Sequence, residues 1–352
     1  MWHLKRPWAR KAVLALVAAL MGALLAGCGG KKAEPVGLPG EGQGEPIATY
    51  KGGQITQTEF DKFTAYLIVE EPTVSVYLQI PAFKEQFVRQ LALYKTLAGQ
   101  ATEAQKNQAE ESAALFAEQL EEYLKAYPAV QEEMTKRGVS ADELKTIRRV
   151  LAAADQVISG KAEELAGKVT EEEIKAEFDK NPNDYNIVTV RHILVSTMDL
   201  STGEEKRTKE EALKRVLEAK DKLEKGAGWD EIAKEYSEDP GSKDNGGLYE
   251  NQRAGVWVTE FKNAANTQKV GVIGDPVETM YGYHIIKVES RDIMTFDKLD
   301  EATKDELKQA VLDSKVQNYL LTEAEKLDIK VNLPAEETPP QEETEPAQTD
   351  QP

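Results

Sequence analysis

The chain has 352 residues, a single cysteine and a formal net charge of −18. An acidic balance of this size argues against nucleic acid as a partner, and against docking on anionic lipid through a basic patch, because phosphate groups attract Lys and Arg. One cysteine excludes an internal disulfide, and the length indicates at least two domains.

Residues 1–27 have the pattern of a secretory signal peptide: basic residues precede an uncharged apolar run, 12–26. The run is shorter than the ~20 apolar residues of a membrane-spanning helix. It ends in Leu-Ala-Gly-Cys28, which resembles the lipobox of bacterial lipoproteins. The resemblance implies cleavage before Cys28 and a lipid on its sulfur that holds the protein on the outer face of the cell membrane. The alternative is a chance cysteine beside an ordinary cleavage site.

Two segments have compositions that do not build a core. Residues 28–46 are rich in Gly, Pro and short polar residues, which predicts a flexible tether. Residues 334–352 hold five Pro and six acidic residues without Lys or Arg, which predicts a disordered acidic tail. Loss of residues 1–27, with four basic residues and no acidic one, changes the net charge to −22.

The segment 47–184 is predicted to form a mostly helical domain with a connecting helix. Thr56, Ser140 and Thr170 are each followed by Glu three residues later, the spacing of a capping box at a helix start. Apolar residues at steps of three and four predict another helix that begins near Pro81. The two later capping boxes predict helices over 141–165 and 171–180.

The periodicity changes after Tyr185. Residues 187–195 and 283–288 are apolar and rich in β-branched side chains, as expected of buried strands. Between them lie predicted helices over 208–225 and 230–236 and a Gly-rich loop, 241–247. This order indicates an α+β domain over 186–291. The segment 296–333 then returns to a helical period and is expected to pack on the N-terminal helices.

His192 and His284 are the histidines that remain once the signal peptide is removed, one on each predicted strand. Alternation along a strand places both among apolar neighbours. If the strands are adjacent, the two rings meet as a cross-strand pair, with ~4.5–5.5 Å between Cβ atoms. Each histidine alone is more typical of a hydrogen-bonded core residue than of a catalyst, but the pair is a candidate site.

Five stretches resemble, in order and spacing, the parvulin family of peptidyl-prolyl isomerases. They are VRHILV (190–195), EYSEDP (235–240), NGGL (245–248), VTEF (258–261) and YGYHIIK (281–287). The resemblance spans about 186–291. It implies an α+β parvulin domain, an antiparallel sheet with surrounding helices, inserted in a mostly α-helical domain. It implies no cofactor.

Carried over by position, His192 and His284 match the family's paired histidines, and Asp239 matches the Asp or Cys beside the substrate amide. We expect the imidazoles to hydrogen-bond each other in the floor of the site. For Asp239 two roles stay open, tuning of the amide or capping of the Asp-Pro-Gly turn. A zinc site built from these three residues ranks far lower, because no spaced ligand motif accompanies them.

The resemblance also implies a proline-binding region. Tyr249, Trp257 and Phe261 stand where the family places Leu, Met and Phe around the proline ring, and Trp257 is expected to narrow the pocket. Thr279 and Tyr281 match positions near the pocket rim.

The helical segments that flank 186–291 resemble PrsA foldase lipoproteins and, more distantly, SurA-like periplasmic chaperones, with 47–60 as the best match. This resemblance implies a membrane-anchored extracytoplasmic foldase that isomerises X–Pro bonds in exported proteins. Its partners would be unfolded or partly folded exported polypeptides. The alternative is a holdase that only binds such chains. Homodimer formation stays open.

Overall fold

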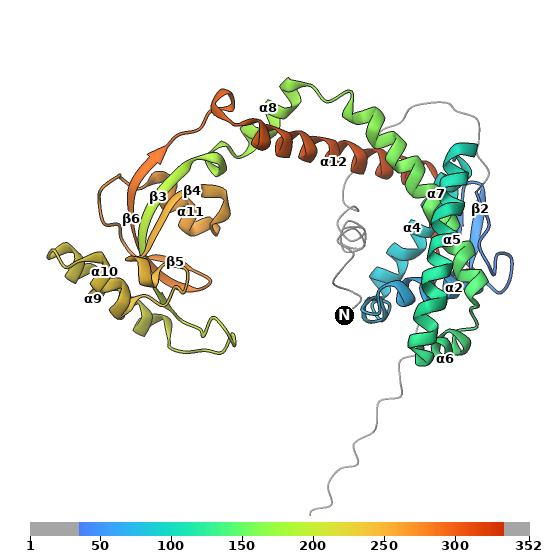
Figure 1. The fold of residues 1–352 in the computed structure, drawn as a ribbon, viewed down its shortest axis with the longest axis horizontal. Coiled ribbons are helices and arrows are strands. Elements are labelled where there is room, and N and C mark those ends of the chain that lie inside the picture. Colours follow the sequence, from blue (N-terminus) through green and yellow to red (C-terminus); the bar gives the residue numbers. More distant parts are fainter. Residues whose placement is uncertain (1–34, 334–352) are drawn as a thin grey trace, which may run out of the picture. The chain divides into compact units, whose positions relative to one another are not determined.

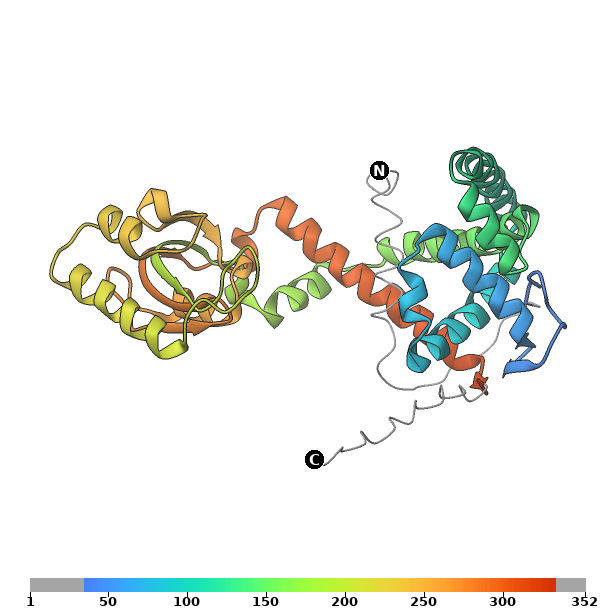
Figure 2. The same cartoon turned by 90° about the horizontal axis from the view of Figure 1, so that it is seen from below.

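The computed structural model describes residues 35–333, which form two compact units. Unit 1 contains the described residues up to Lys168 and those from Leu312 onward, and unit 2 is Val169–Val311. α12 (Glu301–Lys326) is one continuous helix (Figure 2), with its first part in unit 2 and the rest in unit 1. The predicted signal peptide 1–27, the lipidation site Cys28 and the tail 334–352 lie outside the described residues.

Unit 1 combines helices with a small antiparallel sheet of order β2-β1-β7. Ser140 forms the predicted capping box at the start of α7. At the start of α2 only half of the predicted box forms: the Thr56 hydroxyl accepts the Glu59 N–H, but the Glu59 carboxylate binds Lys95 and does not return to the Thr56 N–H. The elements are β1 (Pro46–Tyr50), β2 (Gly53–Thr56), α2 (Gln57–Glu70), α3 (Val74–Tyr77), α4 (Pro81–Gly99), α5 (Glu103–Ala126), α6 (Pro128–Lys136), α7 (Ala141–Ala166) and β7 (Lys330–Val331).

Residues 35–45 pack on unit 1, although the sequence places them in a flexible tether. Leu38 is 5% exposed in the core of the unit, and the Val36 N–H donates to the Lys95 carbonyl at 3.1 Å. The Thr56 hydroxyl donates to the Gly40 carbonyl at 3.0 Å. A few apolar side chains and backbone hydrogen bonds hold this segment, and neither stands out in a Gly- and Pro-rich composition.

Unit 2 is built on a four-stranded antiparallel sheet of order β4-β3-β6-β5. α9 and α10 cover one face of the sheet and α11 covers the other (Figure 1). The elements are α8 (Glu171–Lys180), η2 (Pro182–Tyr185), β3 (Ile187–Ser196), α9 (Lys209–Glu224), α10 (Trp229–Tyr236), η3 (Lys243–Asn245), β4 (Leu248–Arg253), η4 (Ala254–Val256), α11 (Thr259–Thr267), β5 (Val277–Thr279), β6 (Gly282–Asp292) and η5 (Phe296–Lys298). This mixed architecture, antiparallel sheets in a helical context, confirms the predicted fold class.

The C-terminal segment packs in two places. Phe296, Leu299 and Leu307 form a small core with Phe178 of α8, within unit 2. Tyr319, Leu320 and Leu327 pack against the core of unit 1. The expectation that 296–333 packs on the N-terminal helices therefore holds for its C-terminal part. Along residues 35–333, no helix is both long and apolar enough to cross a bilayer.

Candidate active site

The two central strands of unit 2, β3 and β6, bring His192 and His284 together. The register pairs His192 with Ile286 and His284 with Leu194, so the histidines are diagonal neighbours and not the directly opposed pair that the sequence suggested. Their Nδ1 atoms still lie 3.3 Å apart, and the ring centroids are 5.5 Å apart with planes 21° from parallel. Side chains at diagonal positions remain within reach of each other when they are ring-sized.

A β-bulge puts the two histidines on one face. Thr189 pairs with Ser290 and Val190 pairs with Val288, so Glu289 is an extra residue in β6. Because side chains alternate along a strand, this single insertion reverses the facing of every later pair. With an uninterrupted register, His192 would face Lys287, and His284 would point to the opposite side of the sheet.

The imidazoles are almost fully buried, at 3% exposure for His192 and 4% for His284. The Phe261 ring meets both edge to face, with centroid distances of 5.2 and 5.3 Å. Burial, together with the charge that His192 carries when protonated, lowers the pKa of His284 to about 3. At neutral pH His284 is therefore an uncharged hydrogen-bonding group.

Asp239 follows α10 and closes one end of the histidine pair. Its Oδ2 lies 3.0 Å from His192 Nε2 and accepts hydrogen bonds from the hydroxyls of Ser242 and, at 2.9 Å, Tyr249. Burial would raise the pKa of this carboxyl, but hydrogen bonds from His192, Ser242 and Tyr249 hold it well below its usual range. Asp239 Oδ1 accepts the Gly241 N–H at 3.2 Å, so the same side chain also caps the turn.

The protons along this chain can be assigned from its two ends. At one end, the backbone N–H of Tyr281 donates to Thr279 Oγ1 at 3.1 Å, and that hydroxyl lies 2.9 Å from His284 Nε2. At the other end, the ionised Asp239 is an acceptor only. One order of donors satisfies all of these contacts: Thr279 donates to His284, His284 Nδ1–H donates to His192, and His192 Nε2–H donates to Asp239. Each imidazole is thereby fixed in one tautomer.

Gly247 is required where the Gly-rich loop approaches β3. The His192 N–H donates to the Gly247 carbonyl at 2.8 Å. Gly247 has φ +71°, and a Cβ added there would lie 2.1 Å from the His192 carbonyl oxygen. A larger residue would push the loop away from the strand that carries the histidine.

The remaining predicted site residues fall into two groups. Tyr249 stacks on His192 with ring centroids 5.5 Å apart, and Trp257 packs on Phe261 at 5.1 Å, so the predicted aromatic set lies around the imidazoles. Thr279, expected at the rim, is 9% exposed and belongs to the hydrogen-bond chain. Tyr281 has an exposed side chain, 38%, and reaches the site through its backbone N–H.

Sequence reasoning missed Ser242. This residue is 1% exposed, and its Oγ lies 3.0 Å from His192 Nε2 as well as within hydrogen-bond distance of Asp239. The available clue was its place directly after the Asp-Pro-Gly turn, where a short polar side chain faces back toward the turn. Because its hydroxyl donates to Asp239, Ser242 helps to keep that carboxylate ionised.

The donor set does not fit a metal. Both ring nitrogens of His192 and of His284 have hydrogen-bond partners. Within residues 35–333, no group of three or more His, Cys, Asp or Glu side chains is arranged to hold an ion.

Residues 161–292 match the family model of the PPIC-type PPIASE domain. Foldase protein PrsA of Caldanaerobacter subterraneus subsp. tengcongensis is 34% identical over 165 residues, which are 43% of this chain and 49% of that protein. Foldase protein PrsA of a Geobacillus species is 40% identical over 170 residues, 47% of this chain and 54% of that protein. The chain thus spans about half the length of these curated relatives.

Among solved structures, the crystal structure of the peptidylprolyl isomerase PrsA from Bacillus cereus is 26% identical, covers 82% of this chain and 93% of that chain, and has a TM-score of 0.37. The sequence matches confirm the resemblance drawn from the motifs. Residues 161–292 are thus similar to PPIC-type, parvulin-like isomerase domains, and the chain is similar to PrsA foldases.

Proposed function

We propose that this chain, whose residues 161–292 match a peptidyl-prolyl isomerase domain, accelerates cis–trans isomerisation of X–Pro bonds in exported polypeptides. The observation that carries the proposal is the directed hydrogen-bond chain through Thr279, His284, His192 and Asp239, with Phe261 against both imidazoles. This hydrogen-bond chain holds both imidazoles in an apolar setting, next to aromatic side chains of a size to hold a proline ring.

The chemistry requires no bond to break. Rotation about the amide C–N bond meets a barrier of ~18–20 kcal/mol because resonance gives that bond partial double-bond character. The twisted amide is less charge-separated than the planar one, so it is favoured in a site from which water is excluded. Aromatic contacts from Tyr249, Trp257 and Phe261 would hold the ring while the preceding carbonyl turns. A thousandfold acceleration needs only ~4 kcal/mol of differential binding.

A protease-coupled assay of the full chain on an X–Pro peptide series tests this proposal. We expect a cis-to-trans rate that grows linearly with protein concentration for at least some residues before proline. The matched control is the Phe261→Ala variant, which removes the ring that contacts both histidines and should lose most of the rate. If no peptide responds to the wild-type chain, the isomerase proposal is wrong.

A foldase role is also proposed, with unit 1 as the part that holds clients. In unit 1, Val76, Tyr77 and Ile80 expose large apolar side chains, with 66%, 41% and 43% exposure, within one short stretch. We expect a Val76→Ser/Tyr77→Ser/Ile80→Ser variant to suppress aggregation of an unfolded client less well while keeping its isomerase rate. A pure holdase would show the reverse pattern, with aggregation suppressed and no isomerase rate in the wild-type chain.

The proposed location is the outer face of the cell membrane, through lipid on Cys28. The docking of residues 35–45 on unit 1 sharpens this proposal, because only residues 29–34 separate Cys28 from the packed chain. At ~3.3–3.6 Å per residue, the seven steps from Cys28 to residue 35 span at most about 25 Å, so unit 1 would stay close to the membrane surface. Cys28→Ser should move the protein from the membrane fraction to the medium or periplasm, whereas unchanged fractionation would contradict lipid anchoring.

A further inference from the structure

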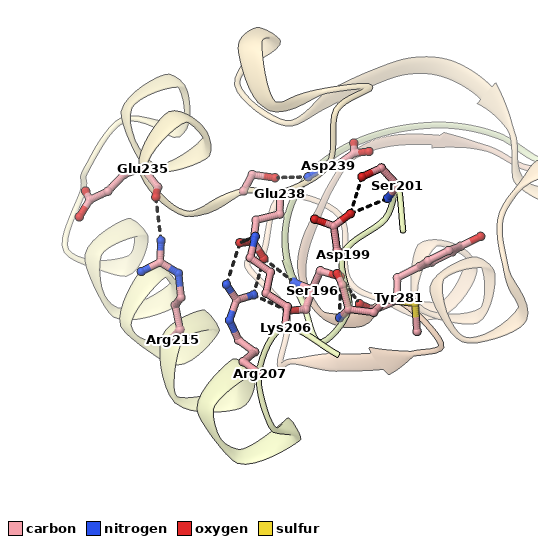
Figure 3. A network of polar contacts seen from close by, with 12 residues as sticks. Ser196, Asp199, Ser201, Lys206, Arg207, Arg215, Glu235, Glu238, Asp239 and Tyr281 are labelled. Atoms are coloured by element: carbon pink, nitrogen blue, oxygen red, sulfur yellow. Dashed lines mark hydrogen bonds and ion pairs between the residues drawn. The ribbon is translucent and has the colours of Figure 1, made fainter. Parts of the chain in front are cut away.

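The carboxylate of Glu238, the residue before Asp239, is bound by two basic side chains and one backbone N–H. Arg207 binds it with two nitrogens, Nη1 to Oε2 at 2.5 Å and Nη2 to Oε1 at 2.8 Å, and Lys206 Nζ adds a contact to Oε1 at 2.8 Å. The Ser196 N–H donates to Oε2 at 2.8 Å, and the Glu238 N–H donates to the Leu194 carbonyl at 2.8 Å. Figure 3 shows Glu238 facing Arg207 and Lys206, with Ser196 at the end of the adjacent strand.

The Ser196 end of this network leads to the other end of the active-site chain. The Ser196 hydroxyl lies 2.8 Å from the Tyr281 carbonyl, and the Thr197 N–H donates to the same carbonyl at 3.1 Å. Arg207 Nη1 also donates to the Ser196 carbonyl. Tyr281 is the residue whose backbone N–H starts the chain through Thr279 to His284. Glu238 is thus bonded to one end of the site through Ser196 and is covalently joined to the other end, Asp239.

The Arg207–Glu238 ion pair at the centre of these contacts is partly shielded from solvent. The Arg207 and Glu238 side chains are only 17% and 20% exposed. Burial would raise the pKa of Glu238, but hydrogen bonds from Arg207, Lys206 and the Ser196 N–H lower it to about 2. The two-nitrogen geometry with Arg adds directional restraint that a single ammonium contact does not supply.

We propose that Glu238, held by Arg207, is a positioning residue of the isomerase site. It fixes the backbone that presents Asp239 and, through Ser196 and Tyr281, the hydroxyl that orders the histidines. This inference rests on the proposed isomerase activity. Glu238 does not itself contact His192 or His284, so its effect reaches the imidazoles through both ends of their hydrogen-bond chain.

Glu238→Gln tests the proposal, because it keeps the size of the side chain and removes the charge that Arg207 grips. Glu235→Gln is the matched control: it makes the same change three residues earlier and breaks the exposed Lys222–Glu235 pair, in which Lys222 Nζ lies 2.8 Å from Oε1. Arg215, which Figure 3 shows at Glu235, contacts only the backbone carbonyl there, at 2.9 Å, and that contact survives the control. Arg207→Lys and Arg207→Met complete the set.

Two readouts separate positioning from general stability. The first is kcat/KM on the X–Pro peptide that the wild-type chain turns over best. The second is the ¹⁵N imidazole spectrum of the full chain in a His3→Gln background, where His192 and His284 are the histidines left. In the donor order given above the proton is on Nε2 of His192 and on Nδ1 of His284, a pattern that a merely less stable domain keeps while it is folded.

We expect Glu238→Gln to lower kcat/KM about tenfold and to mix the two tautomers, at a temperature where circular dichroism shows the variant folded. Arg207→Lys should retain more activity than Arg207→Met, and Glu235→Gln should match the wild type. If Glu238→Gln is folded and keeps both wild-type activity and wild-type tautomers, the inference is overturned. If Glu238→Gln does not fold, Arg207→Met with unchanged tautomers and rate overturns it instead. A wild-type chain without isomerase activity would refute the proposed function, a result distinct from any of these.

Discussion

Each unit buries a cluster of ionisable side chains, and the two clusters are built differently. In unit 2 the hydrogen-bond chain ends at Asp239, whose side chain is 16% exposed, and each polar group on it has a partner. In unit 1, Lys95 and Glu59 are both fully buried, with Nζ 2.5 Å from Oε1, while Glu59 Oε2 and the nearby Tyr50 hydroxyl have no hydrogen-bond partner. One cluster opens toward solvent and the other is sealed.

The sealed cluster of unit 1 has a structural role, whereas the cluster of unit 2 that opens toward solvent is the candidate active site. Lys95 also contacts Glu41, at 3.0 Å, within the segment 35–45 that docks on unit 1. Burial raises the pKa of Glu59, and the charge of Lys95 opposes this shift. A sealed ion pair contributes little net stability but makes removal of one partner expensive. Substitutions in the unit 2 site should instead lower the isomerase activity more than the stability.

The largest effect is expected from Lys95→Met. This change leaves a buried carboxyl without its cation, and it should lower the free energy of unfolding of unit 1 by about 3–5 kcal/mol. Urea unfolding followed by circular dichroism measures it, and the tryptophans among the described residues, Trp229 and Trp257, report on unit 2 alone. Isomerase activity should persist.

Two further variants sharpen this result. Lys125→Met removes an exposed lysine that pairs with Glu121 and should leave the free energy of unfolding almost unchanged. Lys95→Met/Glu59→Met removes both buried charges and should recover most of the loss. Equal losses in the free energy of unfolding for Lys95→Met and Lys125→Met would contradict a structural role for the buried pair.

Asp239→Asn is expected to reduce kcat/KM roughly hundredfold. Three donors, from His192, Ser242 and Tyr249, meet at one carboxylate oxygen of Asp239. An amide would offer them either an N–H₂ group, which cannot accept, or an oxygen that is a weaker acceptor. Peptide assays measure this loss, with far-UV circular dichroism to show that the fold is kept. Asp244→Asn, an exposed position in η3, provides a control with the same chemical change. Near-wild-type activity of Asp239→Asn would leave Asp239 with only its role in the turn.

The stability of unit 2 should fall in mild acid because of His284. The native pKa of about 3 lies below the ~6.5 of an unfolded histidine, so between these values the unfolded state binds one more proton. This group's contribution is complete above pH ~6.5 and is lost toward pH 3, with a slope that approaches ~1.4 kcal/mol per pH unit. The lowered pKa values of Glu238 and Asp239 add losses as the pH falls below ~5.

Urea unfolding of unit 2 by tryptophan fluorescence, at pH steps from 7 to 4, measures that slope in a chain that begins at residue 28. His284→Leu removes the titrating ring and should flatten the profile between pH 6.5 and 4 by about one proton. Lys95→Met should leave the slope of unit 2 unchanged. A His284→Leu profile as steep as that of the wild type would contradict a buried, neutral His284.

Several helices and the two central strands of unit 2 could be predicted from local sequence. Capping boxes at Ser140 and Thr170 start α7 and α8 at the predicted residues, because side chain and backbone meet within four positions. Buried strands β3 and β6 are apolar enough to recognise from composition alone. The pairing of His192, His284 and Asp239 follows from the family resemblance, since nothing within either strand specifies its neighbour.

Features that depend on distant contacts could not be predicted. β4 has exposed polar residues and β5 has three residues, so neither edge strand shows a clear alternation. β7 consists of two residues that pair with β1 across most of the chain. The bulge at Glu289 shifts the register by one residue, and the contacts of Ser242 and Thr279 depend on that register and on turn geometry. A sequence pattern carries no direct information on strand register or on turn geometry.

The smallest effect is expected at Trp257, where the site departs from the family's commoner Met. Trp257 is half-buried and packs on Phe261, away from the hydrogen-bond chain, so Trp257→Met should leave the histidine tautomers unchanged. Loss of the indole ring should leave more room beside Phe261. We expect this change to shift relative kcat/KM toward peptides with bulky residues before proline, by roughly two- to fivefold. A matched change on the opposite face of the sheet, Trp229→Met, should affect stability without altering this preference. Identical preference profiles for the two variants would show that Trp257 packs the core without shaping the substrate surface.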